Sequence, residues 1–281
     1  MPELPEVEIT ARKLKKIGLV GSRLAYFKFL SSKQFRSHIK FSGIKKDVAG
    51  RKIKRIWRKG KVIFIDLDGE PPRTMAIHLK MSGRLSVVSK KEPIDKSARF
   101  IVGFRDGREL RFKDPRRFGI IWYDSPENIL KEKYLAALGT DMLNISYGKF
   151  AKGLSSHDGA IKAILLRQDI FAGIGNITAD EALWEAGIHP KTRVGDLNPK
   201  RIKTLYASIS RVIRRILSAG GTSMRDWGHP DNETGGYQNH FKIYGQIRCP
   251  RCGCSAVKIK VAGRSSSVCP KCQTKTPRRK S

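Results

Sequence analysis

The sequence predicts an α+β fold with several domains, in which an N-terminal β-sandwich precedes a helical region. Short apolar or alternating runs typical of strands follow one another from Ile53, and beyond roughly residue 130 the periodicity becomes helical. All five cysteines lie beyond Gly245, which indicates a small C-terminal element of its own. We therefore expect domains over residues 1–133, 134–245 and 246–276.

The first domain is expected to begin with a helix over residues 3–17, where apolar side chains recur near helical spacing. Short strand-like runs follow, and they predict antiparallel strands stacked in two layers. Asp68-Gly69 and Asp106-Gly107 supply turn residues between neighbouring runs. The runs cover residues 62–65, 75–77, 85–87, 100–102 and 110–112.

Helical signals dominate the second domain. Residues 177–186 predict one helix that ends at Gly187, and Asn198-Pro199 supplies an N-cap and a first-turn proline for the next. A single apolar stripe runs through this second helix until Gly220-Gly221 stops it. Residues 222–238 are polar and contain glycine, so we expect a long loop there.

The charge balance is strongly basic. The chain carries 57 Lys and Arg against 25 Asp and Glu, a formal net charge of +32. Basic residues lie in every third of the chain, which favours folded surfaces that face a polyanion; a generally cationic surface is the alternative. No apolar run reaches transmembrane length and the first residues lack a secretory pattern, so a soluble cytoplasmic protein is the default expectation.

The cysteines form two Cys-x2-Cys pairs separated by sixteen residues. Four thiolates at this spacing predict a tetrahedral zinc site on a hairpin, and its full coordination makes one structural zinc ion the expected cofactor. Cys254 could compete as a ligand, although the pairing favours leaving it free. The expected ligands are Cys249, Cys252, Cys269 and Cys272.

The chain opens with the run Pro2-Glu3-Leu4-Pro5-Glu6, which alone could simply start a helix. This run resembles the N-terminal signature of the formamidopyrimidine-DNA glycosylase family, and further segments resemble that family in order. The four-cysteine hairpin closes the chain where the family has it. The other matching segments are Arg58-Lys59-Gly60-Lys61, His78-Leu79-Lys80-Met81-Ser82-Gly83, Asp114-Pro115-Arg116-Arg117-Phe118-Gly119 and Gly173-Ile174-Gly175-Asn176-Ile177.

The resemblance implies a fold with a helix–two-turns–helix domain and an enzyme that excises oxidised purines from damaged double-stranded DNA. Pro2, exposed by removal of Met1, would attack the sugar as the nucleophile. An α-amino group has a reference pKa of about 7.7–8.0, so a useful fraction is unprotonated near neutral pH. Glu3 would serve as acid and base, and Glu6 looks like the second acidic partner.

The resemblance also implies phosphate and nucleotide contacts. Lys61 matches a lysine that meets the phosphate next to the lesion, and Asn176 opens a helix whose N-terminus can hold another phosphate. Arg264 matches an arginine on the zinc hairpin. Lys162 matches a lysine near the damaged nucleotide, although Ala163 replaces the family's usual proline. From residue type alone, Lys61 and Arg264 could equally be solvated side chains.

A glycosylase must extrude its nucleotide, so side chains must fill the gap in the stack. Met81, Arg116 and Phe118 match the family's wedge residues, and a thioether, a guanidinium and a ring suit that job. The alternative is that Met81 and Phe118 are core residues.

Two rivals to this function stay open at this point. An endonuclease VIII-like glycosylase would prefer oxidised pyrimidines, although Leu4 matches the purine-specific branch. A non-enzymatic zinc-ribbon protein would explain the charge and the cysteines, but not the coincidence of Pro2, Glu3 and Lys61. The zinc-ribbon protein would bind RNA or DNA passively, whereas the glycosylase is expected to act on damaged double-stranded DNA, and the chain is expected to be a monomer.

Overall fold

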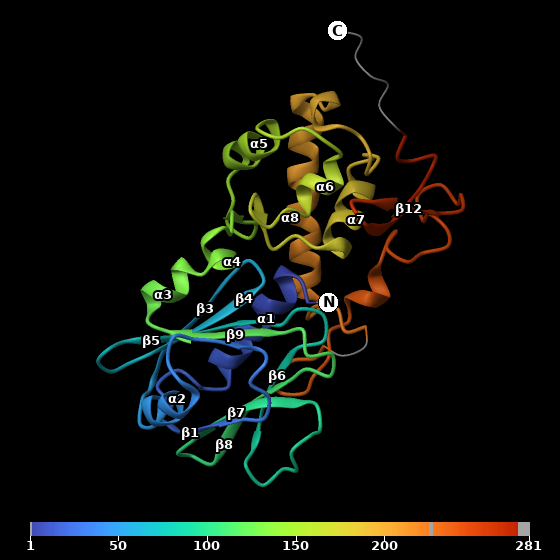
Figure 1. Ribbon diagram of the computed structural model, residues 1–281. Helices are drawn as coiled ribbons and strands as arrows, with labels where there is room; N and C mark the ends of the chain where they lie inside the picture. Colours follow the sequence, from blue (N-terminus) through green and yellow to red (C-terminus); the bar gives the residue numbers. More distant parts are fainter. Residues whose placement is uncertain (1, 225–226, 275–281) are drawn as a thin grey trace. The chain divides into compact units, whose positions relative to one another are not determined.

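The computed structural model describes residues 2–224 and 227–274 and divides the chain into two compact units (Figure 1). Unit 1 comprises Met1–Ala137 and Gly220–Gly236, and unit 2 comprises Leu138–Ala219 and Tyr237–Ser281. The predicted domain limits at residues 133 and 245 stay a prediction. The sequence did not indicate that Gly220–Gly236 would pack with the N-terminal part of the chain.

Unit 1 is the expected two-sheet structure with a helix at its start. One sheet has the order β1-β7-β8-β6 and the other the order β2-β9-β5-β4-β3. The predicted runs pair antiparallel as expected, whereas β2, which the sequence did not predict, pairs with β9 in parallel, so the second sheet is mixed. The elements are α1 Leu4–Lys16, β1 Leu24–Phe29, β2 Phe35–Arg36, α2 Phe41–Val48, β3 Ile53–Lys59, β4 Val62–Leu67, β5 Arg73–His78, β6 Arg84–Ser89, β7 Ala98–Phe104, β8 Arg108–Lys113, β9 Ile120–Asp124, α3 Pro126–Lys131 and α4 Lys133–Ala136.

The core of unit 1 lies between the two sheets. Strand residues such as Ile65 and Met75 from one sheet and Val102 and Leu110 from the other line the same small internal cavity. All four side chains are at most 2% exposed. The strand runs predicted from apolar patterning are therefore the strands that form this core, and Asp106-Gly107 makes the predicted turn between β7 and β8.

Helix α1 begins at the N-cap Glu3, with Pro5 in its first turn, where a missing amide hydrogen costs nothing. Its buried face includes Leu4, Val7 and Leu14, each at most 1% exposed. A buried ion pair fixes the helix to the sheet, because Arg58 Nε on β3 lies 2.7 Å from a carboxylate oxygen of Glu8. These contacts hold the first turn of α1 in place.

Unit 2 is mainly helical and ends in a hairpin. The helix predicted at residues 177–186 is α7, and the Asn198 side chain caps the next helix by accepting from Arg201 N at 2.9 Å. Within the described residues, no helix is both long and apolar enough to span a membrane. The elements are β10 Thr140–Asp141, α5 Tyr147–Ser155, α6 Ile161–Leu165, β11 Phe171–Ala172, α7 Asn176–Glu185, α8 Pro199–Ser218, β12 Val257–Val261 and β13 Arg264–Val268, with short 3-10 turns at Val194–Asp196 and Tyr237–His240.

Candidate active site and zinc centre

The predicted catalytic residues at the N-terminus are buried together at the start of α1. Pro2 is buried, and Glu3 and Glu6 are each 3% exposed. Glu3 N–H donates to Glu6 Oε2 at 2.8 Å, and Thr222 N–H donates to Glu6 Oε1 at 3.0 Å. Glu6 therefore connects the helix start to the segment Gly220–Gly236 of the same unit.

Burial, and next to it the neighbouring charge of Glu3, raises the pKa of Glu6 to about 7. The amide hydrogens of Glu3 and Thr222 act in the opposite direction because they stabilise the carboxylate. A carboxyl group with a pKa near the working pH can both accept and donate a proton efficiently. The start of α1 therefore holds a group suited to proton transfer beside Pro2 and Glu3.

The raised pKa of Glu6 predicts how stability depends on pH. The folded protein binds more protons than the unfolded chain between about pH 4.5 and 7, so the free energy of unfolding falls as pH rises through that range. The contribution is on the order of 3 kcal/mol. We expect Glu6→Gln to flatten this dependence for unit 1, measured by urea unfolding at pH 5 and pH 8.

Glu8→Gln is the matched control, since its salt bridges with Arg58 and Arg12 hold the pKa of Glu8 below its usual value. Stability from Glu8 is fully present above its unfolded pKa and is lost only in more acidic solution. The Glu8 variant should therefore be less stable at both pH values by the same amount. An unchanged pH dependence in Glu6→Gln would contradict the prediction.

Lys61 lies immediately before β4 and is only 4% exposed, which excludes an ordinary solvated lysine. It follows Gly60, whose positive φ of 58° closes the turn from β3. The nearby His78 has its pKa lowered to about 3 by burial and by the charges of Lys80 and Lys61. His78 is therefore neutral, and its Nδ1 accepts from Lys80 N–H at 2.9 Å.

Two loops that carry the predicted wedge residues are joined by a buried aspartate. Asp114 is fully buried; one oxygen accepts from Ser82 Oγ at 2.5 Å and the other from Gly119 N–H at 2.7 Å and Gln34 Nε2 at 2.9 Å. Asp114 thus closes its own loop and binds it to the loop after β5. Sequence reasoning missed this role, although an aspartate directly before a proline is a recognisable loop signal.

The wedge residues project from these anchored loops. Met81 is 43% and Phe118 49% exposed, so the alternative that they are core residues is wrong. Arg116 is also exposed, and its guanidinium carbon lies 4.9 Å from the centre of the Phe118 ring. A rigid base thus presents three side chains suited to stacking or wedging.

We expect Phe118→Ala or Met81→Ala to slow base excision from fully paired duplex much more than from substrate in which the lesion is already unpaired. Unstacking a base step costs roughly a few kcal/mol, and each 1.4 kcal/mol lost is about tenfold in rate. Single-turnover excision on the two substrates measures the difference. The exposure of both side chains predicts nearly unchanged thermal stability; equal slowing on both substrates would contradict a wedge.

In unit 2, three predicted residues meet at the hairpin strand β13. Lys162 Nζ and Asn176 Nδ2 both donate to the carbonyl oxygen of Ser265, at 3.1 and 3.0 Å. Arg264, the residue before it, is exposed. The ammonium of Lys162 is fully buried and paired with Asp180 Oδ1 at 2.6 Å, and the DNA contact expected of it stays a prediction.

Asp180 is the functional residue of this region that sequence reasoning missed. It is 1% exposed, and besides Lys162 it accepts from Ser266 Oγ at 2.6 Å and from Ser267 N–H at 3.1 Å. Desolvation raises its pKa, and Lys162 is the largest influence that opposes this rise. The pair therefore holds the hairpin residues that directly follow Arg264.

The four predicted zinc ligands converge. The Sγ atoms of Cys249, Cys252, Cys269 and Cys272 all lie within 4.8 Å of one another. Two of the Sγ–Sγ distances are 3.9 and 3.4 Å, close to the edge of about 3.8 Å in a tetrahedron with Zn–S bonds of about 2.3 Å. The donor set therefore fits zinc.

Residues around this centre support the ligands. Trp184 Nε1 lies 3.3 Å from Cys249 Sγ, so an indole N–H points at one thiolate. Cys254 contributes its backbone, since its carbonyl oxygen accepts from Cys249 N–H at 2.8 Å. Its thiol is not part of the cluster, in agreement with the Cys-x2-Cys pairing.

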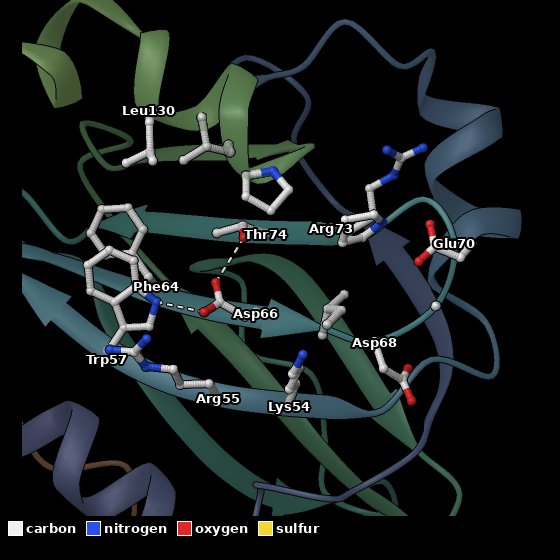
Figure 2. A pocket seen from close by; sticks show the side chains of 15 residues that line it. Lys54, Arg55, Trp57, Phe64, Asp66, Asp68, Glu70, Arg73, Thr74 and Leu130 are labelled. Atoms are coloured by element: carbon white, nitrogen blue, oxygen red, sulfur yellow. Dashed lines mark hydrogen bonds between the residues drawn. The ribbon is translucent and has the colours of Figure 1, made fainter.

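A separate cavity of about 710 Å³ lies in unit 1 between strands β3 to β5 and helix α3. Figure 2 shows Asp66 in this cavity, accepting from Trp57 Nε1 and Thr74 Oγ1, both at 2.8 Å. None of the predicted site residues lines it. The predicted chemistry therefore lies elsewhere on unit 1, at the start of α1 and on the anchored loops.

Comparison with known proteins defines the class of this protein as a DNA-repair glycosylase with a zinc finger. Three family models match in chain order: the formamidopyrimidine-DNA glycosylase N-terminal domain over residues 1–121, its H2TH domain over residues 138–227, and a zinc finger found in FPG and IleRS over residues 247–275. The chain belongs to the formamidopyrimidine-DNA glycosylase family, which confirms the resemblance and its fold.

Individual relatives cover nearly the whole chain. Formamidopyrimidine-DNA glycosylases from Pelotomaculum thermopropionicum and Bacillus subtilis are 36% and 35% identical, covering 97% and 98% of this chain and 99% and 100% of their own. A solved structure of a Lactococcus lactis variant with DNA containing Fapy-dG has a TM-score of 0.88 at 31% identity, covering 98% of this chain and 100% of its own. The same enzyme with abasic-site DNA gives 0.87, again at 31% identity, with coverage of 97% and 100%.

Proposed function

We propose that this protein excises oxidised purines, namely 8-oxoguanine and formamidopyrimidines, from duplex DNA and then cuts the strand at the abasic site. The observation that carries the proposal is the cluster of residues at the start of α1. Pro2 is followed directly by Glu3, and the carboxyl groups of Glu3 and Glu6 are both buried there. A single amine nucleophile supports both steps, so glycosylase and lyase activities belong to one site.

The chemistry begins with removal of Met1, which leaves Pro2 as a secondary amine. Its nitrogen attacks C1′ of the damaged nucleotide and forms a C–N bond as the C–N bond to the base breaks. A proton from Glu3 helps to open the sugar ring, and loss of the ring C1′–O bond gives an iminium joining Pro2 to the sugar.

The iminium acidifies the hydrogen on C2′, so a carboxylate can remove that proton while the 3′ phosphate leaves by β-elimination. A further proton loss allows the 5′ phosphate to leave by δ-elimination. Water then hydrolyses the iminium and regenerates the Pro2 amine. Glu6, whose pKa of about 7 allows it to accept and donate protons, is the second acidic group beside Glu3 during these steps.

We assign the remaining residues to binding. Lys61, Asn176 and Arg264 contact phosphates, while Lys162 and Asp180 are positioning residues that hold the hairpin behind Arg264. The wedge residues Met81, Arg116 and Phe118 fill the space left by the extruded nucleotide. One structural zinc ion is held by the four cysteines, and the protein acts as a cytoplasmic monomer of the bacterial type on damaged double-stranded DNA.

The non-enzymatic alternative is wrong, because the chain belongs to a family of glycosylases. The pyrimidine-specific alternative needs an experiment, since a solved Lactococcus lactis complex contains an oxidised pyrimidine. Strand-cutting assays on duplexes with an oxidised purine, an oxidised pyrimidine or no lesion decide it. We expect the fastest cutting on the purine lesion and none on intact DNA; faster cutting on the pyrimidine lesion would overturn the proposed specificity.

A further inference from the structure

A second group of potential metal ligands lies in unit 1, far along the chain from the cysteines. His229, Asp231 and Glu233 each offer a ligand atom, and these atoms lie within 4.8 Å of one another. His229 is only 4% exposed, whereas the side chains of Asp231 and Glu233 are 30% and 64% exposed. The group thus has a buried nitrogen at its base and two carboxylates open to solvent.

The hydrogen bond of His229 fixes its tautomer. Its Nε2 lies 2.7 Å from the carbonyl oxygen of Gly220. Because a carbonyl can only accept, Nε2 carries the hydrogen, and Nδ1 of the neutral ring is left with its lone pair. The imidazole is therefore held in the form that binds a metal through Nδ1.

Nδ1 lies close to the two carboxylates. It is buried and makes no hydrogen bond of ordinary length among the described residues; it lies 3.9 Å from Asp231 Oδ1 and 3.6 Å from Glu233 Oε2. Three electron-rich atoms this close repel one another unless a positive species lies between them. A proton or a cation at this point would relieve the repulsion.

Lys13 supplies only part of that positive charge. Its Nζ lies 2.7 Å from Asp231 Oδ2 and 2.5 Å from Glu233 Oε2. The Lys13 ammonium thus contacts Asp231 Oδ2, whereas the other oxygen, Asp231 Oδ1, is the one near the His229 ring. A cation bound at His229 would compete with Lys13 for Glu233 but not for Asp231 Oδ2.

We propose that His229 Nδ1, Asp231 Oδ1 and Glu233 Oε2 form a second metal site, which takes a divalent cation of the zinc type. One imidazole and two carboxylates suit Zn²⁺, and solvent supplies the open fourth position. Ligand atoms around zinc at about 2.1 Å are roughly 3.4 Å apart, so the observed separations need to shorten only slightly. The site is independent of the four-cysteine centre and of the proposed catalytic function.

Occupation of this site would fix the part of the chain from residue 229 to residue 233. This part already contacts β6, because Pro230 O accepts from Val87 N–H at 2.8 Å. A metal joining residues 229, 231 and 233 would hold it in one conformation. The conformation of these residues would thus depend on the concentration of the metal.

The test uses full-length protein whose four-cysteine centre is already loaded with zinc. Titration with Zn²⁺, followed by calorimetry and by native mass spectrometry, should show a second bound equivalent. Co²⁺ added in place of this second equivalent should give weak visible bands without the intense ultraviolet band of a thiolate ligand. His229→Gln, which keeps a side-chain donor, and the exposed Glu233→Gln should each weaken the second equivalent by about tenfold or more.

Lys13→Gln separates a metal site from a purely structural salt-bridge cluster. Removing the competing ammonium should tighten the second equivalent by about tenfold, whereas Lys15→Gln on the same helix should leave it unchanged. The proposal is overturned if no second equivalent of zinc binds, or if it binds equally well to His229→Gln and Glu233→Gln. An unchanged affinity in Lys13→Gln would overturn it too. NMR can also detect a proton on His229 Nδ1. If His229 is protonated and no metal binds, the proton is the positive species and the proposal is overturned.

Discussion

One additional residue left in front of Pro2 should abolish base excision and strand cutting together. The extra residue converts the secondary amine of Pro2 into an amide, whose nitrogen cannot form an imine with the sugar. We expect at least a thousandfold loss in both activities, corresponding to about 4 kcal/mol of transition-state stabilisation. Binding to lesion duplex should persist, because Lys61, Asn176 and Arg264 are unchanged. Gel assays of both activities and of binding measure the separation.

Borohydride trapping shows which amine reacts. Reduction of the imine should leave a stable adduct that maps to Pro2 in the processed enzyme and is missing from the extended one. Lys61→Ala should react more slowly but still be trapped, because Lys61 is assigned to a phosphate contact. An adduct on Lys61 or Lys162 would overturn the mechanism. The structure disfavours Lys162 in particular, since its ammonium is buried against Asp180.

The parts of the site that could be predicted from sequence rest on local signals. Pro2 and Glu3 lie at a helix start that is defined by short-range residue preferences. Each Cys-x2-Cys pair brings two thiolates together within one turn of the chain. The strands of the sandwich core follow from runs of a few apolar residues. Each of these features is decided by neighbours in the chain, so the residues alone carry the information.

Contacts between distant segments could not be predicted in this way. Glu6 meets Thr222 across 216 positions, and Lys162 meets Ser265 across 103. The burial of Lys162 depends on Asp180 on a different helix, so neither its residue type nor the family resemblance that implied a DNA contact predicted this ion pair. The parallel pairing of β2 with β9 depends on the tertiary fold for the same reason.

Asp114 shows how a matched motif can still hide its physical role. The motif identified its loop, and the resemblance directed attention to Arg116 and Phe118. The structure shows that the buried carboxylate of Asp114 holds both this loop and the loop of Met81, through Gly119 and Ser82. The exposed residues proposed to act as a wedge thus depend for their position on a buried residue that the resemblance did not single out.

Replacement of Cys269 by serine should abolish tight DNA binding by removing the zinc. Cys269 is fully buried, its Sγ lies 3.4 Å from that of Cys252, and its N–H donates to the Gln273 side chain at 2.9 Å. Structural zinc contributes about 10–16 kcal/mol of binding free energy to local folding in peptide models. Without it, strand β13 and Arg264 should lose their fixed position.

Cys254→Ser is the matched control, because the Cys254 thiol lies outside the cluster and only its carbonyl supports Cys249. This variant should keep its zinc and bind lesion duplex like the parent. The Cys269 variant should lose zinc, measured by atomic absorption, together with at least a hundredfold in affinity, which corresponds to about 2.7 kcal/mol. Unit 1 holds the proposed nucleophile and should keep its own thermal transition, since the zinc centre belongs to unit 2. If the Cys269 variant binds lesion duplex as tightly as the parent, the hairpin does not hold the DNA and Arg264 must be reassigned.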